Sequence, residues 1–163
     1  MTDLIAENPF ENVRDQIGCC GIYCGSCVMG NGVLRGLTAR YRSVLDGYSF
    51  EEWAPAGFDF SEFMKGLSAI VEIPLCHGCQ KGDGAPDCTL RACAQAKGVA
   101  DCVECGLPDD CPHIERREVM RKGAAGAGLK VKEYSADRET LIKEWLSELR
   151  LEWPTGVLFL SDL

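Results

Sequence analysis

Two segments in the first half of the chain repeat apolar residues every three or four positions. The first runs from Val33 to about Tyr48, and Gly47 marks its end. The second begins at Asp59 or Ser61, either of which can cap a helix, and reaches Val71. Such spacing places the apolar side chains on one face of an α-helix. We therefore predict two amphipathic helices, and we assign the aromatic residues of the second helix to core packing.

Two shorter helices are predicted between residues 89 and 122. One covers residues 89–97, with Gly98 in the position that follows its C-terminus. The other covers residues 113–122. The Gly/Ala stretch 123–128 follows directly and predicts a flexible joint, because it contains no residue with a large side chain that could pack.

The last predicted helix has the strongest periodicity in the chain. Asp137 caps it, and it reaches about Leu151, before Pro154 and Gly156. The apolar residues 157–160 predict a strand or an extended segment. One side of the helix is formed by Leu141, Ile142, Trp145, Leu146 and Leu149.

These elements predict a mostly α fold: a small helical domain with cysteine-rich metal-binding loops between its helices. The length of 163 residues is typical of one domain, and 46% hydrophobic residues are enough for a core. Within a single domain over residues 1–163 we expect a leader at 1–17, a cysteine-rich core at 18–121, and a C-terminal helix and tail at 129–163.

The charge balance is acidic. The formal net charge is −8, from 17 basic and 25 acidic residues, and the pI is about 4.8. Such a chain is a poor general binder of nucleic acid or of anionic membranes, so we expect neither as a partner. We assign the one basic run to a solvated helix face; it comprises Arg116, Arg117, Arg121 and Lys122.

The sequence also favours a cytoplasmic protein, in which thiols stay reduced. The first residues show no secretory pattern, and no stretch approaches the roughly 18 apolar residues that cross a bilayer. The eleven cysteines are an odd number, which excludes complete internal disulfide pairing.

The cysteines fall into three clusters, and each cluster contains a C-x2-C pair. In such a turn the backbone N–H groups point at the first sulfur, so both thiolates can bind one metal ion. Several pairs in one chain are a strong signal for a soft metal. The predicted ligands are Cys20, Cys24, Cys27, Cys76, Cys79, Cys88, Cys93, Cys102, Cys105 and Cys111.

Two arrangements of these ligands fit the spacing. In one, the four cysteines of residues 76–93 hold one ion, and the three of residues 102–111 hold another, completed by His113 or a first-cluster thiolate. In the other, residues 20–27 form a C-x3-C-x2-C that binds three irons of a [4Fe–4S] cluster and leaves the fourth open. Both Zn²⁺ and [4Fe–4S] therefore remain candidate cofactors.

Three further residues are expected to stay outside the ligand set. Cys19 adjoins Cys20, and adjacent side chains rarely converge on one ion. His77 lies inside a C-x2-C turn and is expected to point away from the metal, and His113 begins a helix, where it can cap or pack. The chain has no recognisable protease, hydrolase or nucleotide-binding motif, so whether it is an enzyme stays open.

Several motifs together resemble a known family. They are GCCGIYCGSC at 18–27, CHGC at 76–79, CTLRACA at 88–94, and KGVADCVEC at 97–105, followed by Cys111-Pro112. This pattern, over about residues 18–121, resembles an uncharacterised cysteine-rich family of bacteria and archaea. The resemblance implies a metalloprotein, common in anaerobes, which favours iron–sulfur, although the family is usually linked with zinc. It implies no reaction.

Three functions are compatible with these observations. The first is a metalloprotein that acts as a binding or electron-transfer module, with a protein or redox partner. The second is an enzyme with an open metal site at Cys20, Cys24 and Cys27, suited to sulfur transfer or desulfuration. The third is a structural zinc protein whose acidic surface contacts another protein.

Overall fold

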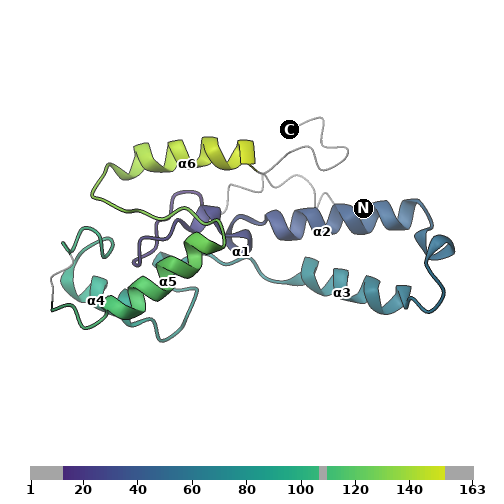
Figure 1. Cartoon of the computed structure of the whole chain (residues 1–163), viewed down its shortest axis with the longest axis horizontal. Coiled ribbons are helices and arrows are strands. Elements are labelled where there is room, and N and C mark those ends of the chain that lie inside the picture. Colours follow the sequence, from purple (N-terminus) through teal and green to yellow (C-terminus); the bar gives the residue numbers. More distant parts are fainter. Residues whose placement is uncertain (1–12, 107–109, 153–163) are drawn as a thin grey trace.

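The computed structural model describes residues 13–106 and 110–152, and this part of the chain is mostly helical, with no β-strand (Figure 1). The predicted mostly α fold is confirmed. The α-helices are α1 (Val28–Asn31), α2 (Val33–Gly47), α3 (Phe60–Glu72), α4 (Thr89–Lys97), α5 (Ile114–Gly126) and α6 (Arg138–Glu152). Single turns of 3-10 helix occur at η1 (Cys24–Ser26), η2 (Phe50–Trp53) and η3 (Cys79–Lys81).

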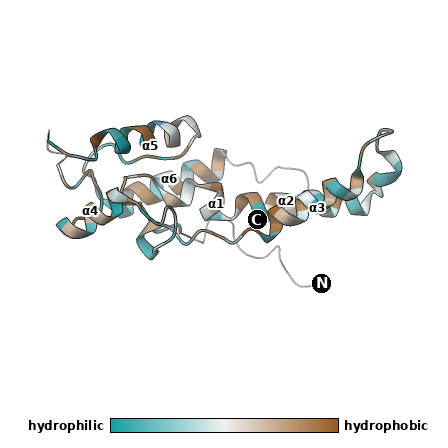
Figure 2. Cartoon of the chain, turned by 90° about the horizontal axis from the view of Figure 1, so that it is seen from below, coloured by the Kyte–Doolittle hydropathy of each residue, from teal (hydrophilic) through white to brown (hydrophobic). Residues whose placement is uncertain are grey.

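Helices α2 and α3 lie side by side and extend away from α4 and α5, as Figures 1 and 2 show from two directions. The predicted Asp59 cap is confirmed, since its carboxylate accepts a hydrogen bond from the Glu62 N–H at 2.9 Å. Assigning the α3 aromatics to a core is wrong, because no residue of α3 is fully buried. They pack instead within this two-helix arm, as in the edge-on contact of Phe63 with Tyr41.

The core lies where α6 covers the first cysteine segment and the start of α2. Its buried residues are Ile17, Tyr23, Val33 and Leu149. The predicted apolar side of α6 is confirmed, and the ring of Trp145 lies 5.3 Å from that of Tyr23. Among the described residues no helix is both long and apolar enough to pass through a membrane.

The predicted leader at 1–17 is wrong at its C-terminal end. Val13, Gln16 and Ile17 are buried, and the Gln16 amide donates a hydrogen bond to the His77 carbonyl at 2.7 Å. These residues therefore belong to the packed structure. Residues 1–12 lie outside the described part of the chain, as does the predicted extended segment at 157–160.

Two predictions about α5 are also wrong. The helix continues through Gly126, so most of the stretch assigned to a flexible joint is helical. Only half of the basic run is a solvated face, since Arg116 and Lys122 are exposed whereas Arg117 and Arg121 are buried. The Arg121 guanidinium donates to the carbonyl oxygens of Lys132, at 2.7 Å, and of Cys20, at 3.3 Å, and so joins α5 to the first cysteine segment.

Candidate metal centre

The first cysteine segment occupies the middle of the structure and joins the other two. An antiparallel bridge pairs Ile22 with Val131. The Cys102 N–H donates to the Cys19 carbonyl at 2.8 Å, and the Cys76 N–H donates to the Met29 carbonyl at 3.1 Å. Clusters that lie far apart in sequence are therefore neighbours in space, which brings thiols from different clusters within reach of one another.

One set of thiols surrounds Cys79, and we call Cys19, Cys20, Cys24, Cys79 and Cys88 the inner thiol group. The Cys79 sulfur accepts hydrogen bonds from the Cys24 thiol and from the Cys19 N–H, the latter at 3.3 Å. These bonds, helped by the charge of Arg91, lower the pKa of Cys79 to about 6 although burial opposes the shift. Cys79 therefore loses its proton more readily than an ordinary thiol.

The pKa values of three neighbouring thiols, Cys19, Cys20 and Cys24, are shifted in the opposite direction. The hydrogen bond to Cys79, followed by burial, raises the pKa of Cys24. Burial, followed by the charge of Cys79, raises the pKa of Cys19 to about 12. Burial also raises the pKa of Cys20, with smaller contributions from Cys79 and Cys88. A negative charge on Cys79 would thus lie among several sulfur atoms, and a cation placed there would stabilise it.

The turn at residues 76–79 has the geometry predicted for a metal knuckle. The Gly78 N–H points at the Cys76 sulfur at 3.4 Å. Gly78 has a φ of +87°, and a Cβ there would collide with the Gln16 amide, so both backbone and packing require glycine. The Arg91 guanidinium fixes the loop that follows by donating to the carbonyl oxygens of Asp83, Ala85 and Pro86.

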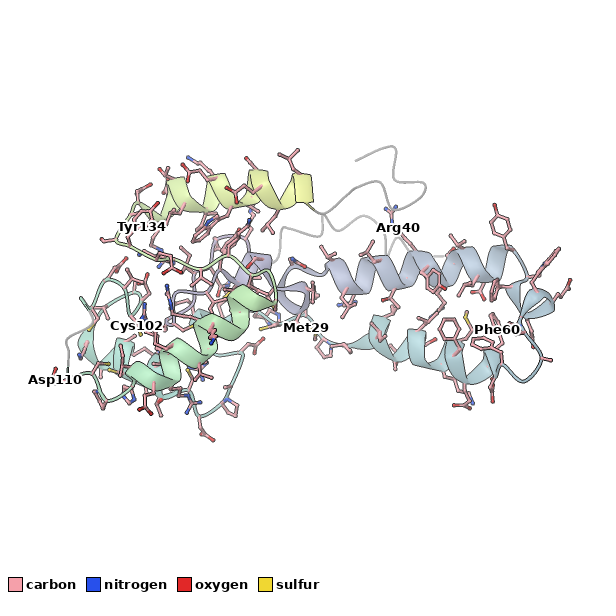
Figure 3. All side chains as sticks on the ribbon, viewed as in Figure 1. Met29, Arg40, Phe60, Cys102, Asp110 and Tyr134 are labelled. Atoms are coloured by element: carbon pink, nitrogen blue, oxygen red, sulfur yellow. The ribbon has the colours of Figure 1, made fainter. Side chains whose placement is uncertain are left out.

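A second set of thiols lines one small cavity, and we call Cys93, Cys102, Cys105 and Cys111 the cavity thiol group. The cavity volume is about 20 Å³. Cys93 comes from α4 and the others from the segment before α5. Figure 3 shows Cys102 and Asp110 at the end of the molecule opposite the tip of the α2–α3 arm.

Two cations and one histidine also line this cavity, namely Lys97, Arg117 and His113, and the rest of its wall is apolar. The Lys97 ammonium donates to the Cys105 sulfur at 3.4 Å, and this contact raises the pKa of Lys97. Burial raises the pKa of Cys102 to about 11, partly offset by the charge of Arg117. The cavity therefore combines four thiols with two positive charges that could balance thiolates.

The structure regroups the predicted ligands. Cys93, predicted to join the other cysteines of the second cluster, lines a cavity together with the three cysteines of residues 102–111. Cys24, predicted to act with Cys20 and Cys27, is hydrogen-bonded to Cys79 of the second cluster. His77 turns its ring to Asp83, with 2.9 Å between Nδ1 and Oδ2, whereas His113 faces the cavity. Cys27 contributes the N-cap residue of α1, without a side-chain cap.

The thiols of each group are neighbours, but their sulfur atoms do not form a coordination site. Within residues 13–106 and 110–152, no three His, Cys, Asp or Glu side chains are placed so that they could hold a metal ion as they stand. No disulfide joins any of the eleven cysteines, all of which belong to the described part. A metal ion would therefore have to draw the sulfurs of either group closer together.

The sequence analysis missed several residues that support the site. Lys97 is one turn after Cys93 on α4, a spacing that could have placed both on one helix face. The buried Lys132 and Asp101, whose side chains are 2.8 Å apart, come from segments that no local pattern connects.

The fold and the thiol groups define a small helical protein in which the first cysteine segment contacts the other two. Residues 16–116 match the family described as "Protein of unknown function (DUF3795)", and the chain belongs to this family. The resemblance to an uncharacterised domain family is thus confirmed. No curated protein and no solved structure matches the chain.

Proposed function

We propose that the protein is a cytoplasmic metalloprotein, and that its cavity thiol group is a closed four-thiolate metal site. The observation that carries this proposal is the single cavity shared by Cys93, Cys102, Cys105 and Cys111. Four thiolates around one ion are the usual ligand set of structural zinc sites. A reducing compartment keeps such thiols available for metal.

Charge balance supports the same proposal. A zinc ion bound by four thiolates carries about −2, because each thiolate contributes −1. Lys97 and Arg117 line the cavity and would offset that charge. The Lys97 ammonium already contacts the Cys105 sulfur at 3.4 Å, in the manner of an outer partner that orients a ligand.

The size of the cavity favours a single ion. About 10–15 Å³ accommodates one water-sized sphere, and the cavity volume is about 20 Å³. A [4Fe–4S] cube contains eight atoms and would require a larger opening. We therefore propose Zn²⁺ for the cavity thiol group.

The inner thiol group would form a second site. Its sulfurs already share hydrogen bonds and charge around Cys79. With Cys19 outside the ligand set, the remaining four would supply a thiolate tetrad, which accepts either Zn²⁺ or a [4Fe–4S] cluster. A cluster here would make the protein an electron-transfer module with a redox partner. An open enzymatic site at Cys20, Cys24 and Cys27 has less support, because the Cys24 thiol is engaged with Cys79.

The proposal predicts how metal binding depends on pH. The Cys102 pKa of about 11 means that this thiol is protonated at neutral pH before metal binds. Binding must release its proton, so the affinity for Zn²⁺ should rise as the pH rises. The increase should continue up to about the pKa of the metal-free thiol.

Metal and sulfide analysis of anaerobically purified protein tests the proposal. We expect at least one equivalent of zinc, and the variant Cys105→Ser should lose one equivalent. Cys27→Ser is the matched control, because it removes a half-buried thiol that belongs to neither thiol group. A folded protein with neither metal nor sulfide would contradict the proposal, as would equal metal loss in the two variants.

A further inference from the structure

The α2–α3 arm ends in a surface rich in aromatic and acidic residues, which we call the arm tip and define as residues 46–62. It comprises the last turn of α2, the η2 turn and the first turn of α3. In Figure 3, Phe60 lies towards this end of the arm, far from Cys102. The arm tip is therefore separate from both thiol groups.

The aromatic side chains of the arm tip are unusually exposed. Trp53 is 77% exposed and Tyr48 is 69% exposed, and Phe58 and Phe50 are also accessible. Tryptophan and tyrosine are the residues most often central to protein–protein interfaces. A group of exposed aromatic side chains on a protein surface commonly marks an interaction site.

All charged side chains of the arm tip are negative. It carries five carboxylates and no basic residue: Asp46, Glu51, Glu52, Asp59 and Glu62. Among the ion pairs of the described residues, only Glu62 of these five has a partner, which is Lys65. Asp46 also sits in the last turn of α2, where the helix dipole is already negative and no basic side chain compensates.

An open groove of about 580 Å³ runs beside the arm tip. Its walls include three carboxylates and one cation, which pairs with Glu62, together with two large apolar side chains: Asp46, Glu51, Glu72, Lys65, Phe60 and Met64. Carboxylates around an apolar floor suit a lysine or arginine side chain, whose aliphatic stem packs while its charged head meets the carboxylates.

From this combination we propose that the arm tip is a docking surface for a basic, amphipathic segment of another protein. Charge complementarity selects this occupant. The terminal segments 1–12 and 153–163 contain no lysine or arginine, so neither could neutralise the carboxylates. A second copy is disfavoured by the net charge of −8, because two acidic chains repel each other.

A binding titration with a defined peptide tests the proposal. The probe is a synthetic helical peptide of lysine and leucine, titrated into the full chain by calorimetry. The same peptide with glutamate in place of lysine, and one with serine in place of leucine, test whether both charge and apolar contact are needed. We expect binding of the lysine–leucine peptide and at least about tenfold weaker binding of the other two.

Matched variants locate the binding surface. Glu51→Lys/Glu52→Lys and Trp53→Ala should each weaken binding of the lysine–leucine peptide about tenfold or more. Glu139→Lys/Glu144→Lys makes the same change in net charge on exposed residues of α6, and we expect less than about a twofold effect from it. Circular dichroism of each variant confirms that it is folded.

Three results would overturn the proposal. Equal weakening by the two double charge reversals would mean that only net charge matters. Absence of binding by the lysine–leucine peptide to the unaltered chain would remove the docking surface. Sedimentation of the chain alone as a dimer that Trp53→Ala dissociates would assign the arm tip to a second copy.

Discussion

The buried ion pair between Lys132 and Asp101 offers a sharp test of how the cavity thiol group is held in place. Both side chains are fully buried, 2.8 Å apart, and the Lys132 ammonium also contacts Glu104 at 3.0 Å. Asp101 Oδ1 accepts the N–H groups of Val103, at 2.9 Å, and Glu104, at 3.2 Å. The pair thus fixes the turn that carries Cys102 and Cys105.

The protonation state of the pair follows from its contacts. Burial by itself would lower the pKa of Lys132, but hydrogen bonds to Asp101 and Glu104 raise it above the ordinary value. The ammonium is therefore charged at neutral pH, and the stabilisation is lost only as the pH rises through this raised pKa. At neutral pH, Lys132→Met leaves the Asp101 carboxylate buried without its main partner.

The expected loss of stability is large. Removing one member of a buried ion pair typically costs about 3–5 kcal/mol. We expect the lower half of this range, because Arg138 lies 3.6 Å from Asp101 and can compensate in part. At about 2–4 °C per kcal/mol for a chain of this length, Tm should fall by about 6–16 °C.

Urea and thermal unfolding followed by circular dichroism measure this loss. Lys65→Met is the matched control, since Lys65 pairs with Glu62 on the surface and the same substitution should cost less than about 1 kcal/mol. Asp101→Asn combined with Lys132→Met should recover part of the loss, because no fully buried charge is then left unpaired. A cost for Lys132→Met no larger than that for Lys65→Met would refute the reasoning.

Three further predictions concern other parts of the structure. Gly78→Ala should destabilise the protein by at least about 1 kcal/mol in urea unfolding, because of the positive φ and the collision with Gln16. Gly36→Ala, in an open position of α2, should instead stabilise it by about 0.5–1 kcal/mol. A change of the same sign in both variants would contradict this prediction. Hydrogen bonds from the Thr140 N–H and hydroxyl lower the pKa of Asp137, so its capping of α6 is fully present above its ordinary pKa and is lost as the pH falls through the lowered one; Asp137→Asn should flatten the acid limb of the stability profile, and an unchanged limb would count against this cap. Leu149→Ala should cost about 2–5 kcal/mol in the same assay, since this side chain is 1% exposed in the core, and a cost below about 1 kcal/mol would show that α6 does not complete that core.

Local sequence patterns predicted most helices because their causes are local. Helix α4 begins after Cys88, whose side chain caps it, and continues through a run of helix-forming residues. It ends just before Gly98, whose φ of +66° favours glycine. The extension of α5 was missed because its glycines suggested a break. The two glycines cost about 1 kcal/mol each, and tertiary packing of the buried Ala124, Arg117 and Arg121 offsets this cost.

Contacts between distant segments explain the other errors. Arg121 is buried because it reaches the carbonyl oxygens of Cys20 and Lys132, which are 101 and 11 residues away. Nothing in the spacing of charges along α5 specifies those acceptors. The α3 aromatics look like core residues in sequence, but α3 packs along α2 in an arm, so one face of each helix stays partly exposed.

The candidate site was predictable turn by turn but not as a whole. The C-x2-C pattern predicted the N–H that points at the Cys76 sulfur, since that geometry lies within one turn. The grouping of the thiols depends on how α4 and the first cysteine segment pack. For that reason the place of Cys93 beside Cys102 became evident only in three dimensions.

The most direct test of the account is to identify which cysteines bind one and the same ion. Protein loaded with a spin-active cadmium isotope allows scalar couplings between the metal and cysteine β-protons to be recorded by NMR. We predict that one cadmium resonance couples to Cys93, Cys102, Cys105 and Cys111. A resonance that couples Cys93 to Cys76, Cys79 and Cys88, or a folded protein that binds no cadmium, would contradict the account.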